Sequence, residues 1–131
     1  MSYYYNEPTC TIDVAVKQNK VVGYISCCVD SEKAMDYFSE KMSYYKLFKD
    51  QYKDYPAHLH INCHPQFQGL GAGSLLIQSL IKRLRQNGSC GLHLVTDPQA
   101  ANVVFYGKNG FEPVVTRSVN NYGHVMMGLK L

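Results

Sequence analysis

Apolar and polar residues alternate in two runs near the start of the chain. Residues 11–17 and residues 21–29 each have the pattern of a strand, and residues 18–20 have the composition of a tight turn. Because two such runs joined by a short turn form a hairpin, the sequence predicts an antiparallel pair of strands here. Residues 1–9 are polar and rich in tyrosine, so we expect a loose lead-in to the first strand.

A helical pattern follows the hairpin. Residues 32–53 have apolar positions at helical spacing that allow a break near Ser43, and Ser31 has a side chain suited to capping the helix. Pro56 ends the segment. The tyrosines of residues 36–55 have two interpretations that the sequence leaves open. They line a substrate pocket, or they belong to an amphipathic helix that covers a sheet.

The next segment, residues 57–64, is expected to be a strand that Pro65 ends. Successive side chains of a strand point to opposite faces, so one face here is polar and the other is apolar. The polar face comprises His58, His60 and Asn62, and the apolar face comprises Leu59, Ile61 and Cys63.

The remainder of the chain alternates between helices and strands. The expected elements are a helix ending near Asn87, a strand over 91–96, a helix from Asp97-Pro98 to Lys108, and closing strands over 112–117 and 124–131. The order is then ββ-α-β-α-β-α-ββ in one domain, residues 1–131. This order predicts an α/β (α+β) fold, with a mixed sheet and helices packed on its faces.

Composition narrows the classes of function. The chain has 131 residues, of which 46% are apolar and 18% are charged, so it can bury a core. The net charge of +3 suits an anionic small molecule, and no basic cluster indicates a nucleic-acid partner. No apolar stretch is long enough to cross a membrane, and no signal peptide is visible. We therefore expect a cytoplasmic protein with neither nucleic-acid nor membrane partners.

The five cysteines are expected to be reduced. Their number is odd and no CxxC pair occurs among them, so buried thiols fit better than a disulfide framework. A zinc site is not expected, because Cys63 points away from His58 and His60 and no distant ligand is evident. A buried strand thiol is usually inert, so Cys63 is not expected to act as a nucleophile.

The strongest chemical signal is a glycine-rich turn between a strand and a helix. It reads Gln68-Gly69-Leu70-Gly71-Ala72-Gly73-Ser74. The first N–H groups of a helix have no partner within the helix and carry partial positive charge. Glycines let a ligand approach them closely, so a phosphate or pyrophosphate is the natural ligand.

Two nucleotide-binding motifs compete for these residues. A P-loop requires a lysine after the glycines, and none is present. A dinucleotide-binding turn requires GxGxxG; Gly69 and Gly71 fit, but the third position is Ser74. Asp97 lies where a ribose-binding acid is expected. A hairpin and a helix precede the turn, and too little chain follows it for a second nucleotide-binding half, so we rank this interpretation second.

Two segments resemble the GCN5-related N-acetyltransferases, the GNAT superfamily. Residues 68–73 match the Q/R-x-x-G-x-G/A signature, and residues 105–111 (FYGKNGF) look like the FYxKxGF segment at the distance usual in that family. Residues 57–73 are also similar to the acetyltransferase-like domains found with O-GlcNAc hydrolases. The resemblance covers residues 10–131 and implies a mostly antiparallel sheet with helices on both faces.

The family's usual N-terminal strand and helices are not matched in this sequence. In that family, those helices normally line the side of the site where the acceptor binds. We therefore expect that a second copy, as in a homodimer, or another chain completes that side.

This resemblance implies an enzyme that transfers the acetyl group of acetyl-CoA to a primary amine of a small molecule or peptide, by direct attack in a ternary complex. The implied CoA-binding residues are Ile61, Asn62, Cys63, Gln68, Gly69, Leu70, Gly71, Ala72, Gly73, Ser74, Asn102 and Tyr106. Tyr106 is also the implied general acid, because its phenol is less acidic than a thiol.

The general base is left open by the sequence. The subgroup often has Asp at the position of Asn62, and an asparagine cannot accept a proton at neutral pH. His60 or His64 is the candidate substitute, because imidazole titrates near neutrality. The alternative function is a catalytically degenerate module that binds CoA or a protein partner.

Overall fold

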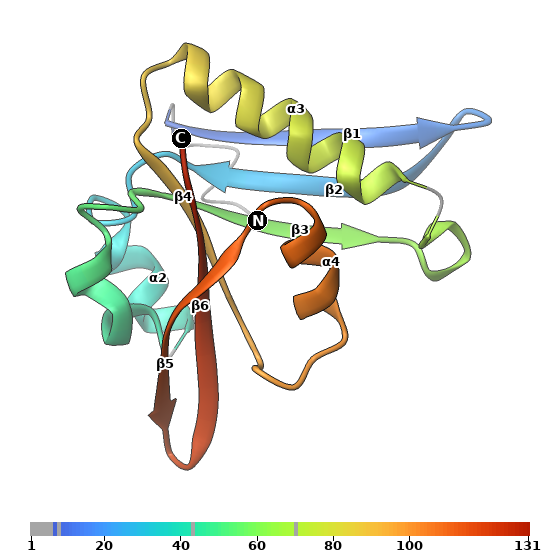
Figure 1. Cartoon of the computed structure of the whole chain (residues 1–131). Coiled ribbons are helices and arrows are strands. Elements are labelled where there is room, and N and C mark those ends of the chain that lie inside the picture. Colours follow the sequence, from blue (N-terminus) through green and yellow to red (C-terminus); the bar gives the residue numbers. More distant parts are fainter. Residues whose placement is uncertain (1–6, 8, 43, 70) are drawn as a thin grey trace.

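One six-stranded sheet organises the described part of the chain, with the strand order β1-β2-β3-β4-β6-β5 (Figure 1). The computed structural model describes residues 7, 9–42, 44–69 and 71–131. Its strands are β1 (Cys10–Lys17), β2 (Lys20–Cys28), β3 (Ala57–Cys63), β4 (Gly91–Thr96), β5 (Glu112–Val119) and β6 (Tyr122–Lys130). Its α-helices are α2 (Met35–Lys41), α3 (Ala72–Gln86) and α4 (Asn102–Lys108), and its 3-10 helices are η1 (Tyr45–Gln51) and η2 (Pro65–Phe67).

The order of the elements confirms the order expected from the sequence. Neighbouring strands are antiparallel except for β3 and β4, which are parallel. The hairpin β1–β2 turns through Gln18 and Asn19, whose φ angles are 51° and 63°, and β5–β6 turns through Asn120 and Asn121 at 50° and 69°. Two consecutive residues of this kind make a turn whose twist matches that of the paired strands. Most of the expected lead-in lies outside the described residues.

Helices cover both faces of the sheet, as expected. Ile77 and Leu84 of α3 share one buried core with Leu92 of β4 and with side chains of α4. Phe48 of η1 shares the opposite core with Met126 of β6 and with side chains of α2. Figure 1 shows α3 lying along β1 and β2. The amphipathic segments of the sequence thus form two layers that enclose the sheet.

The two expected faces of β3 are confirmed. Leu59, Ile61 and Cys63 pack against the core beneath α3 and α4. His58 faces the opposite core, where its ring lies edge-on to Phe38 at a centroid distance of 4.9 Å.

The helical segment before β3 is shorter and more broken than expected. Residues 32–53 form two short helices, α2 and η1, because Met42 takes an extended backbone conformation (φ −130°, ψ 112°). Ser43, where a break was expected, lies outside the described residues. Ser31 does not cap a helix, since it is buried and its Oγ donates a hydrogen bond to the carbonyl of Pro56 at 2.7 Å.

The last helix also starts later than expected. α4 begins at Asn102 and not at Pro98. Asp97 instead accepts a hydrogen bond from the Gln99 N–H at 2.8 Å, so its carboxylate stabilises a turn before the helix.

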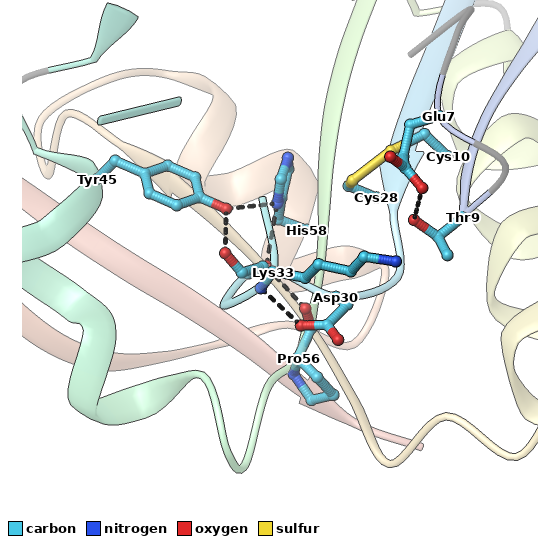
Figure 2. Close-up of a disulfide and its surroundings, with 10 residues drawn as sticks. Glu7, Thr9, Cys10, Cys28, Asp30, Lys33, Tyr45, Pro56 and His58 are labelled. Atoms are coloured by element: carbon cyan, nitrogen blue, oxygen red, sulfur yellow. Dashed lines mark hydrogen bonds between the residues drawn. A yellow bond between two sulfur atoms is a disulfide. The ribbon is translucent and has the colours of Figure 1, made fainter. Parts of the chain in front are cut away.

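Cys10 and Cys28 form a disulfide between β1 and β2 (Figure 2). The expectation that all five cysteines are reduced is therefore wrong for this pair. The two residues are directly opposite each other in the register of the hairpin, which brings their side chains together. Cys27, Cys63 and Cys90 are free.

Two buried histidines lie side by side where β3 and β4 meet. The rings of His58 and His93 have centroids 5.9 Å apart. Nδ1 of His93 donates to the carbonyl of Tyr55 at 2.7 Å. Nδ1 of His58 lies 3.0 Å from Ser31 Oγ and 3.3 Å from the hydroxyl of Tyr45 (Figure 2).

The hydrogen bonds around His58 determine the role of its Nδ1 atom. The Ser31 hydroxyl donates to one carbonyl, and the Tyr45 hydroxyl donates to another, that of Ser31, at 2.8 Å. Both hydroxyl hydrogens are then committed, so Nδ1 of His58 is the donor in this cluster. Burial lowers the pKa of His58 to about 3, with a further contribution from His93, and lowers the pKa of His93 to about 4.

These pKa values predict that acid destabilises the fold before most carboxylates titrate. Both pKa values are lowered from 6.5, so the unfolded chain binds more protons than the folded chain below pH 6.5. Stability should be constant above about pH 7 and fall below pH 6.5, by up to about 1.4 kcal/mol per pH unit for each histidine. Urea unfolding between pH 7.5 and 5 would measure this slope.

A control separates these histidines from the rest. His64 is exposed, so His64→Gln should leave the slope unchanged, whereas His58→Gln should reduce it. If that variant does not fold, proton NMR of the wild-type imidazoles supplies the same test. Either ring titrating near pH 6.5 in the folded protein would contradict the prediction.

Candidate functional site

The parallel strands β3 and β4 pair at one end and diverge at the other. In the described structure they pair only through Ala57 with Leu92 and His58 with His93. Beyond this point β3 continues along β2 as far as Cys63, while β4 continues along β6. A gap therefore opens in the middle of the sheet.

Backbone groups of β3 face this gap. The His64 N–H donates to the Val22 carbonyl at 2.7 Å, so the backbone groups of His64 face β2. Direction alternates along a strand, so the N–H and C=O groups of Ile61 and Cys63 point the other way, toward β4. The Gln68 amide nitrogen reaches the Cys63 carbonyl from that side at 3.2 Å, and thereby joins the glycine turn to the end of β3.

The glycine turn leads from β3 into α3 through two left-handed residues. Gly69 has φ +81° and Gly71, which precedes the first residue of α3, has φ +88°. An L-residue would be strained at either position. The first intrahelical bond runs from the Leu75 N–H to the Gly71 carbonyl, at 3.0 Å. The N–H groups of the preceding residues of α3 have no partner within the helix, which makes this terminus attractive to an anion.

Gly73 is required for close packing. A Cβ atom added to it would lie 2.9 Å from Cζ of Phe105 in α4. The absence of a side chain at Gly73 thus lets α4 approach the start of α3.

A pocket of about 690 Å³ occupies the space between the gap, the glycine turn and α4. This volume is within the range of small-molecule sites. Its lining residues come from β3, the turn and the two helices, and are Ile61, Asn62, Cys63, Phe67, Gln68, Gly69, Gly71, Gly73, Ser74, Ala101, Asn102, Phe105 and Tyr106.

Most of the expected CoA-binding residues meet in this pocket. Ala72 is the first residue of α3 and does not line it, and Leu70 lies outside the described residues. Three further residues, Phe67, Ala101 and Phe105, line the pocket and were not predicted. The sequence could have indicated Phe105, because it is the first residue of the FYxKxGF segment. No motif in the sequence indicated Phe67 or Ala101.

Tyr106 is buried at the wall of the pocket. Burial raises the pKa of its phenol, with a further contribution from Cys63, so the hydroxyl stays protonated at neutral pH. Burial also raises the pKa of the half-buried Cys63 thiol. A phenol that stays protonated has a proton available for transfer, while a protonated thiol is a poor nucleophile.

Asn109 connects the two helices that border the pocket. Its side-chain amide donates to Ser74 Oγ of α3 at 3.2 Å and to the Phe105 carbonyl of α4 at 3.0 Å. Its amide oxygen accepts from Gln78 of α3 at 3.2 Å. One buried side chain thus fixes the start of α3 relative to the helix that carries Tyr106.

A second, smaller space lies where the same gap meets the opposite face of the sheet. Its volume is about 50 Å³. We call it the aromatic hollow, and its lining residues are Met42, Tyr44, Tyr45, Tyr52, His58, Leu59, His60, His93, Leu94 and Val95. His60 therefore borders the aromatic hollow and not the pocket, whereas its neighbours Ile61 and Asn62 border the pocket.

The tyrosines before β3 cover the sheet, which confirms one of the two interpretations left open by the sequence, and a role in a substrate pocket stays a prediction. Tyr45 and Tyr52 are buried against the sheet, and Tyr44, Tyr45 and Tyr52 also border the aromatic hollow.

No metal site is formed by the described residues: no three His, Cys, Asp or Glu side chains among them come together around a common point. Among the same residues, no helix has both the length and the apolar character needed to span a membrane.

Comparison with known proteins identifies the family. The sequence profile of the acetyltransferase (GNAT) domain matches residues 8–113, so the chain belongs to the GNAT acetyltransferase family. It is 44% identical over 48 residues to the uncharacterized N-acetyltransferase ycf52 of Porphyra purpurea, and 46% identical over 48 residues to that of Pyropia yezoensis. The match covers 37% of this chain and about a quarter (26%) of the length of each relative.

Solved structures share the fold. An aminoglycoside 6'-N-acetyltransferase complexed with coenzyme A has a TM-score of 0.70 at 17% identity, over 98% of this chain and 76% of the other. The PaiA N-acetyltransferase of Thermoplasma acidophilum, in complex with coenzyme A, has a TM-score of 0.67 at 15% identity, over 99% and 66%. The ribosomal-protein-alanine N-acetyltransferase of Brucella melitensis has 0.68 at 20%, over 96% and 72%. The finer similarity to domains found with O-GlcNAc hydrolases stays a prediction.

Two glycine substitutions should have opposite effects on stability. Gly73→Ala places a methyl group against the Phe105 ring and should destabilise the fold by about 1–3 kcal/mol, as overpacking does. Gly107 lies in the last turn of α4, where an added methyl group meets no atom within 4 Å, so Gly107→Ala should stabilise the fold by about 0.5–1 kcal/mol.

Urea unfolding of both variants beside the wild type measures the difference. Equal effects would show that the contact between α3 and α4 does not limit the residue at position 73.

Proposed function

We propose that this protein is an acetyl-CoA-dependent N-acetyltransferase that acetylates a primary amine of a small molecule or peptide within a ternary complex. The observation that supports it best is the meeting, in one pocket, of three unrelated features. These are the open backbone of β3, the glycine turn at the start of α3, and the buried phenol of Tyr106.

Each part of acetyl-CoA has a suitable partner in this proposal. The pyrophosphate would accept hydrogen bonds from the first N–H groups of α3, next to Gly71 and Gly73. The Ser74 hydroxyl accepts from Asn109, which leaves its own hydrogen for a phosphate oxygen. The pantetheine amides would pair with the backbone of Ile61 and Cys63, in the way an additional strand pairs with a sheet edge.

The proposed reaction needs two proton transfers. The amine nitrogen attacks the thioester carbonyl, so an N–C bond forms and the C–S bond breaks. Tyr106 would give a proton to the departing CoA thiolate. A backbone N–H of β3 would stabilise the oxyanion, a contribution of about 3 kcal/mol per donor in other acyl-transfer enzymes.

His60 is the preferred candidate for the proton acceptor. Partial desolvation of this exposed side chain lowers its pKa, so its imidazole is unprotonated at neutral pH and can accept a proton from the amine, directly or through water. His64 is less suitable, because its Nδ1 already accepts from the Gln66 N–H at 3.2 Å. Asn62 would position the amine or a water by hydrogen bonding, since an amide does not accept a proton.

Ligand titration tests the cofactor part of this proposal. Acetyl-CoA should raise the melting temperature, because a ligand that binds only the folded state at 100 times its Kd adds about 2.7 kcal/mol of stability. NAD serves as the control for a dinucleotide-binding turn. A shift with NAD and none with acetyl-CoA would contradict the proposal.

Substitution of Tyr106 tests the chemistry separately from binding. Tyr106→Phe should lower kcat by about 100-fold or more and leave the Kd for acetyl-CoA within a few-fold, since only the proton is removed. Free-thiol release measures the first quantity and calorimetry the second. Tyr122→Phe is the matched control, because Tyr122 is exposed on β6.

Two other outcomes are informative. Equal turnover of the wild type and Tyr106→Phe would remove Tyr106 from the role of general acid. Binding of acetyl-CoA without thiol release for any amine would support the alternative, a CoA-binding module without catalytic activity.

A further inference from the structure

Asn109 is a buried polar residue at the point where α4 ends. It is 8% exposed and directly follows Lys108, the last residue of the helix. Its backbone N–H donates to the Tyr106 carbonyl at 3.0 Å, and the Phe111 N–H donates to the same carbonyl at 3.1 Å. These two bonds close the helix around Asn109, so its backbone is held in place while its side chain reaches across to α3.

The partners of the Asn109 amide determine which of its ends is the nitrogen. The Phe105 carbonyl can only accept a hydrogen bond, so the atom 3.0 Å from it must be Nδ2. The amide oxygen accepts from Nε2 of Gln78 at 3.2 Å. A flipped amide would place an oxygen against the carbonyl and lose that bond. Asn109 therefore has one defined orientation.

This orientation determines the role of the Ser74 hydroxyl. The second hydrogen of Asn109 Nδ2 points to Ser74 Oγ, 3.2 Å away, so this oxygen accepts. The hydrogen of the hydroxyl then remains to be donated elsewhere. Because Ser74 lines the pocket, a ligand bound there can accept it.

An anionic oxygen is the best acceptor for this hydrogen. Ser74 is the third residue of α3, so its hydroxyl lies with N–H groups that carry the partial positive charge of the helix start. No Asp or Glu is present among the described residues that line the pocket. Linked hydrogen bonds polarise one another, so a hydroxyl that accepts from Asn109 is a stronger donor than an isolated one. These features together favour a phosphate oxygen.

The packing of the two helices keeps Asn109 within reach of Ser74. Phe105 and Asn109 are four residues apart, so they lie on the same side of α4. The backbone of Gly73, next to Ser74, lies against the Phe105 ring, because an added Cβ atom would be 2.9 Å from Cζ. The apolar contact and the hydrogen bond are thus neighbours, and the first sets the spacing that the second requires.

We propose that Asn109 is a positioning residue: it fixes the Ser74 hydroxyl as a hydrogen-bond donor for the pyrophosphate of CoA. Asn109 does not line the pocket, so it acts through Ser74 and not by touching the ligand. This inference rests on the proposed function, because it takes the start of α3 as the pyrophosphate site. It makes the binding of CoA depend on a residue outside both the pocket and the glycine turn.

Replacing the Asn109 amide by a carboxylate should reverse the hydrogen bond. Asn109→Asp keeps the shape of the side chain, but a carboxylate only accepts, so the Ser74 hydroxyl donates to it and no longer to the ligand. The Kd for CoA should rise by at least about tenfold, since a hydrogen bond to a charged oxygen is lost. Calorimetry would measure this constant.

Pantetheine separates this role from a purely structural one. It is the part of CoA that lacks the pyrophosphate, so its Kd should stay within a few-fold in Asn109→Asp. Equal losses for CoA and pantetheine would show that Asn109 only holds the helices together, and would overturn the proposal. Asn87→Asp is the matched control, because it makes the same exchange at the exposed C-cap of α3, about 20 Å along the helix from Ser74, and should change neither constant.

A double-mutant cycle separates the turned hydroxyl from the charge that Asp adds. Ser74→Ala should raise the Kd for CoA by about tenfold. Asn109→Asp should then add little on this background, because no hydroxyl remains to be turned. A loss of the same size on both backgrounds would mean that the new charge repels the ligand directly, and would contradict the role assigned to Asn109.

The wild-type protein supplies the test if Asn109→Asp does not fold. The side-chain NH2 signals of Asn109 should shift in NMR spectra when CoA is added and not when pantetheine is added, because only CoA reaches the Ser74 hydroxyl. Unchanged signals at saturating CoA would overturn the proposal.

Binding and turnover tell this inference apart from the proposed function. If the Kd for CoA depends on Asn109 and Ser74 as expected but no amine releases free thiol, the positioning role stands and the proposed enzyme activity falls. If an amine is acetylated while both variants bind CoA as tightly as the wild type, the activity stands and the positioning role is wrong. A wild type that does not bind CoA overturns both.

Discussion

The short parallel contact between β3 and β4 is the constraint on which the rest of the structure depends. Two residue pairs hold the described strands together, beside the buried rings of His58 and His93. If the pairing continued, β4 would occupy the backbone groups of Ile61 and Cys63 and close the gap. Because β4 follows β6 instead, the described part of β4 does not pair with the backbone of Ile61 and Cys63, and that edge of β3 is left to the pocket.

The sequence predicted the features that depend on local pattern. The hairpins, the alternating faces of β3 and the glycine turn each follow from residues close together in the chain. The predicted start of α4 was wrong, also for a local reason. Asp97 can cap a helix or close a turn with the same hydrogen bond, and here it closes a turn that ends before Asn102. The link that Asn109 makes between the two helices could not be predicted, since its partners Ser74 and Gln78 lie on α3, far away in the sequence.

The disulfide partner of Cys10 could not be predicted from local pattern, because it depends on the register of the whole hairpin. A regular hairpin that pairs Lys17 with Lys20 would place Cys10 opposite Cys27. A bulge between Ala15 and Val16 shifts the register by one residue, so Cys10 lies opposite Cys28 instead. The apolar positions of the two strands are compatible with the register on either side of this bulge. The choice of partner is therefore determined by packing along the whole strand, which the sequence does not reveal.

The long antiparallel contact between β3 and β2 has a consequence for the sidedness of the site. In the described structure, six residue pairs run without a shift from Gly23 opposite Cys63 to Cys28 opposite His58. Side chains alternate with a period of two, so a slip of one residue would turn His60 toward α3 and Ile61 toward η1. β2 supplies no residue to the lining of the pocket. Its register with β3 nevertheless determines which β3 side chains face each side of the gap.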